Sequence, residues 1–267
     1  MLIFVVFLAL AIGYVFLIKG RINHKDLSAF QGWYYAHRGL YSTGVPENSM
    51  AAFRAAKEKG YGIELDVHLM ADGNLAVIHD SSLKRITGQD VLIEDLTASD
   101  LENYRLAGTE EKIPLFSQVL DLYAGSAPLI VELKAVGANY AALSAATCNM
   151  LDSYNGAYCV ESFDPRCVAW FRKHRKDVIR GQLTENFFRS KSNLPWFIKF
   201  ALKHHLLNIA SRPDFVACRF EDRKTISNFL CRYLWGMQGV TWTIRTKEDF
   251  DIAVREDWIP IFENFRP

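Results

Sequence analysis

Two apolar segments of this chain carry acidic side chains at alternate positions. Glu64 and Asp66 alternate with apolar residues in one segment, and Glu132 and Lys134 alternate in another. Successive side chains of a β-strand point to opposite faces, so each pair shares a face. Three carboxylates on the inner face of a covered sheet require a cation or shifted pKa values. Hard oxygen ligands suit Ca²⁺ or Mg²⁺, so the pattern predicts one divalent cation held by Glu64, Asp66 and Glu132.

Both segments also have a simpler interpretation. Glu64 and Asp66 alone are equally typical of the solvated face of a surface strand. Lys134 either pairs with a neighbouring carboxylate or holds an anion that the metal also contacts. The sequence alone leaves these alternatives open.

Two histidines follow apolar runs that we predict to be strands. His37 is followed by Arg38 and Gly39, and His79 is followed by Asp80. Histidine titrates near neutrality, so a pair placed at the carboxyl ends of barrel strands can supply a general acid and a general base. The planar guanidinium of Arg38 matches phosphate oxygens. Strand alternation predicts that Asp80 points away from His79 and serves as a turn or capping residue.

The elements that would position these residues alternate between strands and helices. Eight strands are predicted, at 34–37, 62–67, 75–79, 128–134, 157–163, 179–183, 215–218 and 239–244. Helices are predicted at 48–58, 116–123, 140–151, 165–174, 195–209, 224–234 and 247–256. Eight such units favour a closed parallel barrel over a doubly wound sheet. The link between residues 67 and 75 is too short for a crossover helix and has an Asp72-Gly73 turn signal, so a hairpin arm is the alternative there. Residues 81–114 are long enough to form a cap.

The N-terminus differs in composition from the rest. Residues 1–18 contain no charged side chain, and Lys19, Arg21, His24 and Lys25 follow. This pattern predicts an uncleaved transmembrane anchor, with a signal peptide as the alternative. The positive-inside rule then places the catalytic domain in the cytoplasm, as part of a single-pass membrane protein. The predicted domains are the anchor at 1–18, a linker at 19–33 and a barrel at 34–267.

Composition limits the other classes. The 267 residues suffice for one barrel, and a net charge of +1 does not favour a nucleic-acid partner. The five cysteines, Cys148, Cys159, Cys167, Cys218 and Cys231, lack metal-site spacing, which favours buried free thiols.

A series of short motifs, in order, closely resembles the glycerophosphodiester phosphodiesterase family, in a membrane-anchored bacterial-type form. The motifs occur at 36–39, 46–49, 64–67, 79–80, 85–88, 113–114, 132–134, 162–165, 181–183 and 241–243. Each is weak alone, but their order and spacing are specific. The resemblance covers residues 34 to 267 and implies an irregular TIM (β/α)8 barrel with a divalent-metal hydrolase site.

The resemblance also implies a role for each matching residue. Glu64, Asp66 and Glu132 match the metal ligands, and His37 and His79 match the catalytic pair. The phosphate binders correspond to Arg38 and Lys134, and the motif that supports the first histidine loop corresponds to Glu47 and Asn48. Trp242 matches an aromatic residue beside the alcohol portion of the substrate, although a core tryptophan is the alternative.

The implied reaction is hydrolysis of a glycerophosphodiester to an alcohol and sn-glycerol 3-phosphate. The alternatives are a lysophospholipase D-type enzyme acting on membrane lysophospholipids and an inactive barrel that binds lipid headgroups. Two departures from the family pattern concern the substrate wall: Ile244-Arg245 replaces an expected Asn, and 262–267 lacks the usual Thr-Asp-x-Pro-like turn. The aromatic-rich segment 187–210 is either an ordinary outer helix or a hydrophobic lid.

Overall fold

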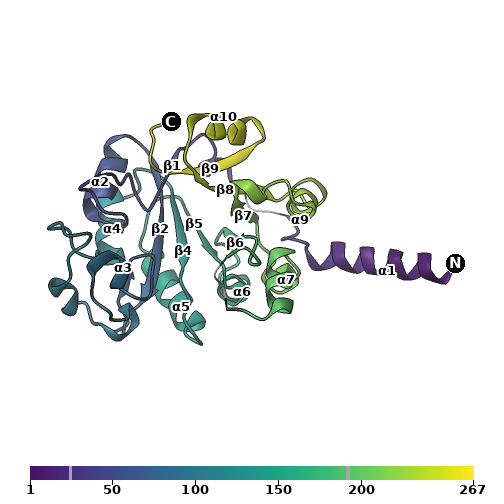
Figure 1. Ribbon diagram of the computed structural model, residues 1–267, viewed down its shortest axis with the longest axis horizontal. Coiled ribbons are helices and arrows are strands. Elements are labelled where there is room, and N and C mark those ends of the chain that lie inside the picture. The colour runs from purple at the N-terminus through teal and green to yellow at the C-terminus, as the bar shows by residue number, and fades with distance from the viewer. Residues whose placement is uncertain (24–25, 191–192) are drawn as a thin grey trace.

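The computed structural model describes residues 1–23, 26–190 and 193–267, so His24 and Lys25 lie outside the described residues (Figure 1). Its strands are β1 (Tyr35–His37), β2 (Gly62–Leu69), β3 (Leu75–Val77), β4 (Leu129–Leu133), β5 (Tyr158–Ser162), β6 (Arg180–Thr184), β7 (Phe215–Arg219), β8 (Gln238–Ile244) and β9 (Trp258–Phe262). Its α-helices are α1 (Leu2–Leu17), α2 (Met50–Glu58), α3 (Lys84–Thr87), α4 (Phe116–Tyr123), α5 (Tyr140–Leu151), α6 (Pro165–His174), α7 (Trp196–Lys203), α8 (Asn208–Ser211), α9 (Ile226–Phe229) and α10 (Lys247–Arg255).

The sheet closes into a barrel of eight parallel strands. Its order is β1-β9-β8-β7-β6-β5-β4-β2, and β1 pairs with β2 to close the ring. The parallel pairing carries all the carboxyl ends to one rim, which is where barrels of this type place their active sites. The predicted α/β TIM barrel is therefore confirmed.

Two strand assignments differ from the prediction. β3 is not a barrel strand, because it pairs antiparallel with the far end of β2 and forms the hairpin arm that the short link suggested. The eighth barrel strand is β9, which the sequence analysis missed because Pro260 interrupts its apolar run. Pro260 fits because proline lacks only a donor, and its carbonyl remains available to a neighbouring strand.

Side chains along the barrel strands point alternately outward and inward, as predicted. On β2, Ile63, Leu65 and Val67 point outward into the main hydrophobic core, where Phe53 of α2 and Phe116 of α4 also lie. The intervening Glu64 and Asp66 consequently face the barrel interior. Residues 81–114 form a cap with its own small core, which includes Leu83, Ile93 and Leu101.

The N-terminal helix α1 projects from the barrel, as Figure 1 shows. It has 16 residues, none of them buried, and at roughly 1.5 Å per residue it is about 24 Å long. The hydrocarbon core of a bilayer is roughly 30 Å thick. Among the residues that the structure describes, no helix combines the length and apolar character needed to cross a membrane. The prediction of a transmembrane anchor over residues 1–18 is corrected accordingly, and the cytoplasmic placement of the barrel stays a prediction.

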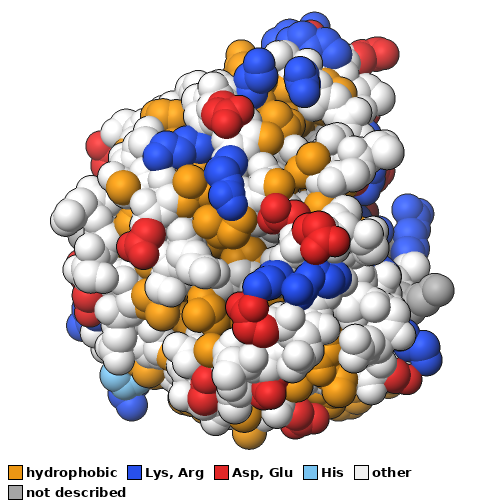
Figure 2. Space-filling model, turned by 90° about the vertical axis from the view of Figure 1, so that its left-hand side faces the viewer, with side chains coloured by type: hydrophobic (Ala, Val, Ile, Leu, Met, Phe, Trp, Pro, Cys, Tyr) orange, Lys and Arg blue, Asp and Glu red, His pale blue; other side chains and the backbone are white. Residues whose placement is uncertain are grey.

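One face of the molecule carries charges of both signs. Acidic and basic side chains interleave with apolar ones on the face turned away from α1 (Figure 2).

All five cysteines are free and buried, as predicted.

Candidate active site

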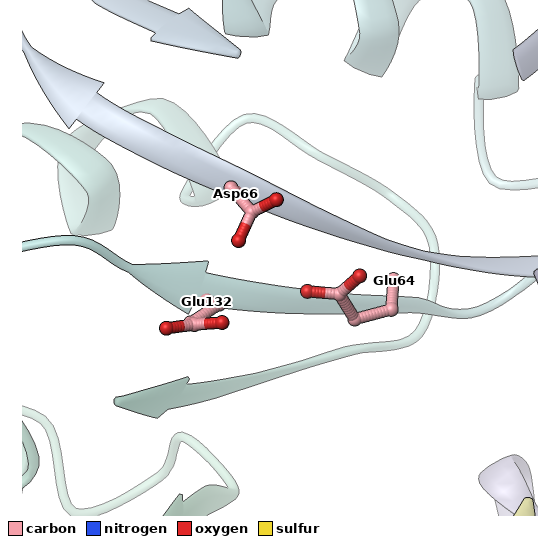
Figure 3. Close-up of side chains that lie close together, drawn as sticks. All are labelled: Glu64, Asp66 and Glu132. Atoms are coloured by element: carbon pink, nitrogen blue, oxygen red, sulfur yellow. The ribbon is translucent and has the colours of Figure 1, made fainter. Parts of the chain in front are cut away.

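Three carboxylates from neighbouring strands converge inside the barrel (Figure 3). Asp66 of β2 lies directly opposite Glu132 of β4 in the parallel register, and Glu64 lies one inward position earlier on β2. One ligand oxygen from each lies within 4.8 Å of the others, and the three residues are 3%, 0% and 7% exposed for Glu64, Asp66 and Glu132. The alternation in the sequence therefore brings all three predicted ligands together.

The charges of this triad are only partly balanced. Lys134 contacts Asp66 Oδ1 at 3.0 Å and Glu132 Oε1 at 2.8 Å. Burial and the neighbouring carboxylates raise the pKa of Glu64 well above its usual value. Burial would also raise the pKa of Asp66, but Lys134, His79 and Arg38 outweigh it and lower that pKa. The carboxylates thus compete for the available positive charge.

A further buried acid stands beside the triad. Glu161 of β5 lies opposite Glu132 in the sheet register, and its Oε2 has no hydrogen-bond partner among the described residues. Burial and then Glu132 raise the pKa of Glu161 well above its usual value. This surplus of buried, hard oxygen donors fits a divalent cation such as Ca²⁺ or Mg²⁺. Glu161 was not predicted as a site residue, although it alternates with the apolar Val160 in a predicted strand.

His37 ends β1 and is fixed by Glu263, the residue that follows the last strand, β9. Its Nδ1 lies 2.6 Å from Glu263 Oε2, and Glu263 Oε1 accepts a 2.7 Å hydrogen bond from Arg245 Nε. Burial alone would raise the pKa of Glu263, but His37, Tyr41 and Arg245 hold it at about 2. An ionised carboxylate only accepts hydrogen bonds, so Nδ1 of His37 carries the proton. Its Nε2 is therefore left as the ring nitrogen available for proton transfer.

His79 is held in the same manner, although not where the sequence placed it. The antiparallel arm β3 returns the chain to the barrel mouth, where the Ile78 amide donates to the Asp66 carbonyl. Asp80 does not point away as predicted: its Oδ1 lies 2.6 Å from His79 Nδ1. The side chain of Asp80 turns back because the chain has left the regular strand after Val77. Both histidines thus have Nδ1 tied to a carboxylate.

Arg38 occupies a tight turn between the two histidines. Its φ of 56° is positive, and its backbone amide lies 3.2 Å from Glu64 Oε2. Its guanidinium donates to Glu47 Oε1 at 2.9 Å and lies 3.5 Å from Asp66 Oδ2. The backbone and the side chain of Arg38 are therefore both fixed by carboxylates of the site.

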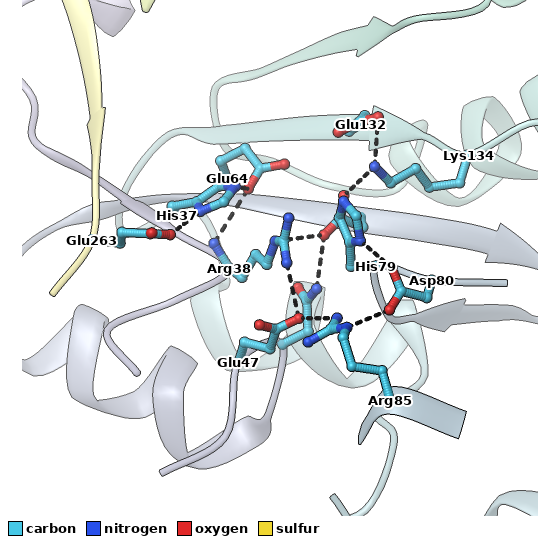
Figure 4. A network of polar contacts seen from close by, with 12 residues as sticks. His37, Arg38, Glu47, Glu64, His79, Asp80, Arg85, Glu132, Lys134 and Glu263 are labelled. Atoms are coloured by element: carbon cyan, nitrogen blue, oxygen red, sulfur yellow. Dashed lines mark hydrogen bonds and ion pairs between the residues drawn. The ribbon is translucent and has the colours of Figure 1, made fainter. Parts of the chain in front are cut away.

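A continuous polar network joins these groups (Figure 4). Glu47 also accepts a 2.6 Å hydrogen bond from Arg85, and Arg85 in turn contacts Asp80 beside His79. Asn48, at 2% exposure, donates from Nδ2 to Asp66 Oδ2 at 2.8 Å. The predicted supporting residues Glu47 and Asn48 therefore lie next to Arg38 and the carboxylates.

The open space above this network is a cavity of about 540 Å³. Trp242 of β8 forms part of its wall, together with Phe163, whose ring is 5.7 Å away edge-on. The predicted residues that line the cavity are His37, Arg38, Glu47, Glu64, His79, Glu132, Lys134 and Trp242. Asp66 and Asn48 lie beneath it and contact the lining residues.

The structure adds residues that the sequence analysis missed. Glu263 follows the missed strand β9, so recognising an apolar run before an acidic residue would have found it. His68, the next inward residue of β2 after Asp66, bridges Glu94 Oε1 at 2.6 Å and the His79 carbonyl at 3.2 Å. The same alternation that predicted Glu64 and Asp66 contains the signal for His68.

Comparison with known proteins agrees with this arrangement. Residues 37–217 match the glycerophosphoryl diester phosphodiesterase family. The chain belongs to this family. The matched range begins at His37, the first histidine of the site.

Several proteins with similar sequences are named as phosphodiesterases or lysophospholipases of this family. A glycerophosphodiester phosphodiesterase of Bacillus altitudinis is 39% identical over 108 residues, which are 38% of this chain and 43% of the relative. One of Caldanaerobacter subterraneus subsp. tengcongensis is 35% identical over 45% of this chain and 52% of its own. The chain therefore matches about half the length of these relatives. A lysophospholipase D of Rattus norvegicus is 31% identical over 42% of this chain and 40% of its own.

Solved structures of the family share the fold over nearly the whole chain. An Oleispira antarctica phosphodiesterase, in complex with the product sn-glycerol-3-phosphate, has a TM-score of 0.71. It is 20% identical and covers 88% of this chain and 93% of its own. A glycerophosphodiester phosphodiesterase of Thermotoga maritima has a TM-score of 0.65 at 24% identity, over 87% and 95% of the two chains. At these identities the likeness shows the fold alone.

Proposed function

We propose that this chain is a metal-dependent glycerophosphodiester phosphodiesterase that releases an alcohol and sn-glycerol 3-phosphate. One observation carries the proposal. Two histidines, each with Nδ1 tied to an ionised carboxylate, line one cavity beside three buried carboxylates. Phosphodiester hydrolysis requires proton transfer to the leaving oxygen and from the nucleophile, together with stabilisation of charge on phosphate.

The chain supplies its own phosphate-binding cations. Arg38 and Lys134 line the cavity, and each is already held by carboxylates of the site. Burial alone would lower the pKa of Lys134, but Asp66 and Glu132 outweigh it and raise the pKa, so the ammonium stays charged. Groups fixed in advance stabilise developing charge without reorganisation. Arg38 and Lys134 would therefore bind and orient the phosphate.

Proton transfer falls to His37 and His79. Nδ1 of each ring donates to a carboxylate, which fixes the tautomer and the ring orientation. The opposite nitrogen, Nε2, would accept a proton from the nucleophile on one histidine and donate a proton to the leaving alkoxide on the other. Trp242 and Phe163 would pack beside the alcohol portion.

The divalent cation, Ca²⁺ or Mg²⁺, would be held by Glu64, Asp66 and Glu132. Such an ion offsets negative charge on phosphate oxygens when it is bound. Lys134 contacts two of the three carboxylates, so the lysine and the ion would share their negative charge.

The decisive experiment is a metal-dependent assay on a panel of glycerophosphodiesters and lysophospholipids. We expect glycerol 3-phosphate from glycerophosphodiesters after addition of Ca²⁺ or Mg²⁺, and no product after chelation. Full activity in excess chelator would contradict the metal requirement. Absence of turnover with either metal would instead favour the inactive, headgroup-binding barrel.

Lysophospholipase D activity is the second candidate, and an apolar groove favours it. The groove has a volume of about 620 Å³ and shares Glu132, Lys134 and Phe163 with the active-site cavity. Its apolar side is formed by residues in and around α7, namely Phe187, Leu194, Ile198, Leu202 and Leu207. An acyl chain would fit along this side while its phosphate lies at Lys134. Release of choline or ethanolamine from lysolipids tests this candidate.

A further inference from the structure

A second charged pocket lies at the opposite rim of the barrel. It has a volume of about 580 Å³ and forms where the foot of α1 meets the amino end of β6. Six of the residues that line it are basic, and none of the described lining residues is acidic. We call it the basic pocket, and its cations are Lys19, Arg21, Arg172, Lys176, Arg180 and Arg212.

Arg180 is the buried member of this group. It is 2% exposed, and it donates from Nε to the Ser211 carbonyl at 3.2 Å and from Nη2 to the Arg212 carbonyl at 2.8 Å. Its Nη1 finds no acceptor among the described residues. A buried guanidinium nitrogen without a partner is costly, so this position favours an acceptor supplied from outside the chain.

The other cations are oriented but poorly neutralised. Arg172 and Arg212 donate to backbone carbonyls, at 2.8 Å to Ile209 and at 2.9 Å to Lys19 respectively. Carbonyl groups direct a guanidinium without cancelling its charge. Arg21 forms an ion pair of 3.2 Å with the buried Asp214. Burial, followed by repulsion from Arg172, lowers the pKa of Arg212.

We propose that the basic pocket binds a phosphate ester, at a site separate from the active site. Phosphate presents several acceptor oxygens and a negative charge, which match forked guanidinium donors in a pocket whose described lining residues include no acid. The ester has two possible sources, an anionic lipid headgroup and a soluble phosphate ester. Phe16 of α1 also lines the pocket, and the exposed apolar surface of α1 continues from there, so either source can reach the site.

The test compares two double variants of the full-length chain. Arg172→Gln with Lys176→Gln removes two exposed cations of the pocket, whereas Lys173→Gln with Arg255→Gln removes two exposed cations outside it. Unchanged melting temperatures verify that both variants are folded. One arm measures sedimentation with phosphatidylcholine vesicles, with and without phosphatidylglycerol. The other measures calorimetric titration with inorganic phosphate and with glycerol 3-phosphate.

If a lipid headgroup is the source, the pocket variant loses roughly tenfold to thirtyfold in affinity for phosphatidylglycerol vesicles. Binding to phosphatidylcholine alone stays the same, and the control variant matches the wild type. If a soluble ester is the source, the calorimetric titration loses one binding site in the pocket variant only. The active site keeps its own phosphate contacts in both variants, so failure of the proposed catalysis does not affect this comparison. Equal behaviour of the two variants in both arms overturns the proposal.

Discussion

The two rims of the barrel gather charge mainly of opposite sign and hold it in different ways. At the carboxyl rim, four buried acids face Arg38 and Lys134, and the site connects charge to charge through Glu47, Arg85 and Asp80. At the amino rim, the arginines of the basic pocket are directed mainly by backbone carbonyls. A network of ion pairs fixes groups for chemistry, whereas carbonyl-oriented cations provide attraction alone. The difference favours catalysis at the first rim and binding at the second.

The largest expected effect follows from a substitution of Glu64, whose negative charge is the least compensated in the acidic rim. Glu64→Gln should abolish measurable turnover, because the divalent ion proposed at this site would contribute several kcal/mol of charge stabilisation. The metal-free variant should melt at or above the wild-type temperature, since burial and like charges raise the pKa of Glu64. Steady-state assays and thermal melts check both parts. Wild-type activity in this variant would remove Glu64 from the site.

Substitutions of the two histidines should have the next largest effect on turnover. His37→Ala and His79→Ala should each lower kcat by about 10² to 10⁴, the usual contribution of a general acid or base. Glu263→Gln should also lower kcat, by up to about 10⁴, because the glutamine no longer fixes the tautomer of His37 that carries its proton on Nδ1. Product-release assays at saturating substrate measure these losses. Near-normal turnover in either alanine variant would exclude that histidine from proton transfer.

A buried histidine outside both rims offers a contrast, since it has no charged partner among the residues that the structure describes. His205 is 1% exposed, and its Nε2 lies 2.7 Å from Asn228 Oδ1. Burial lowers its pKa to about 4. The unfolded chain binds this proton below about pH 6.5 and the folded chain only below about pH 4, so stability falls as the pH drops through this window.

The expected loss is about 3 kcal/mol of unfolding free energy between about pH 7 and pH 4. His205→Gln keeps a donor toward Asn228 and cannot titrate, so its stability should depend less on pH by that amount. Urea unfolding at several pH values measures the difference. Identical pH profiles for the variant and the wild type would show that His205 does not control acid stability.

The barrel and three carboxylates of its acidic rim could be predicted from the sequence because both follow from local periodicity, whereas the fourth acid, Glu161, was not predicted. Alternation placed Glu64, Asp66 and Glu132 inward, and the order of motifs identified the family. The prediction failed where chain direction matters: residues 75–79 were assigned to a barrel strand, with a hairpin arm as the alternative, and Asp80 was expected to point away from His79. Glu263 was not predicted because the strand before it, β9, was not predicted, since Pro260 interrupts the apolar run of that strand. The basic pocket could not be predicted, since its cations come from segments joined only by the fold.

The smallest predicted effect concerns the groove between α7 and the acidic rim. Trp196 and Phe197 are exposed at 72% and 54%, whereas Ile198 lines the groove. If α7 only covers the barrel, polar substitutions there should affect all substrates equally. If the groove holds an acyl chain, Ile198→Asn should lower kcat/KM for lysolipids about tenfold, which corresponds to about 1.4 kcal/mol of lost apolar contact.

Soluble glycerophosphodiesters provide the matched control, because they have no chain to place in the groove. Their kcat/KM should be unchanged in Ile198→Asn. Trp196→Ala with Phe197→Ala distinguishes the role of the groove from that of the exposed surface of α7. If these side chains contact the lipid surface, this variant should lower activity on micellar or bilayer lysolipid. Its activity on soluble substrates should be unchanged. Equal losses on both substrate classes would indicate a folding defect. No loss of activity in either variant would indicate that α7 is an ordinary outer helix of the barrel. The acidic rim would then act without a contribution from the groove beside α7.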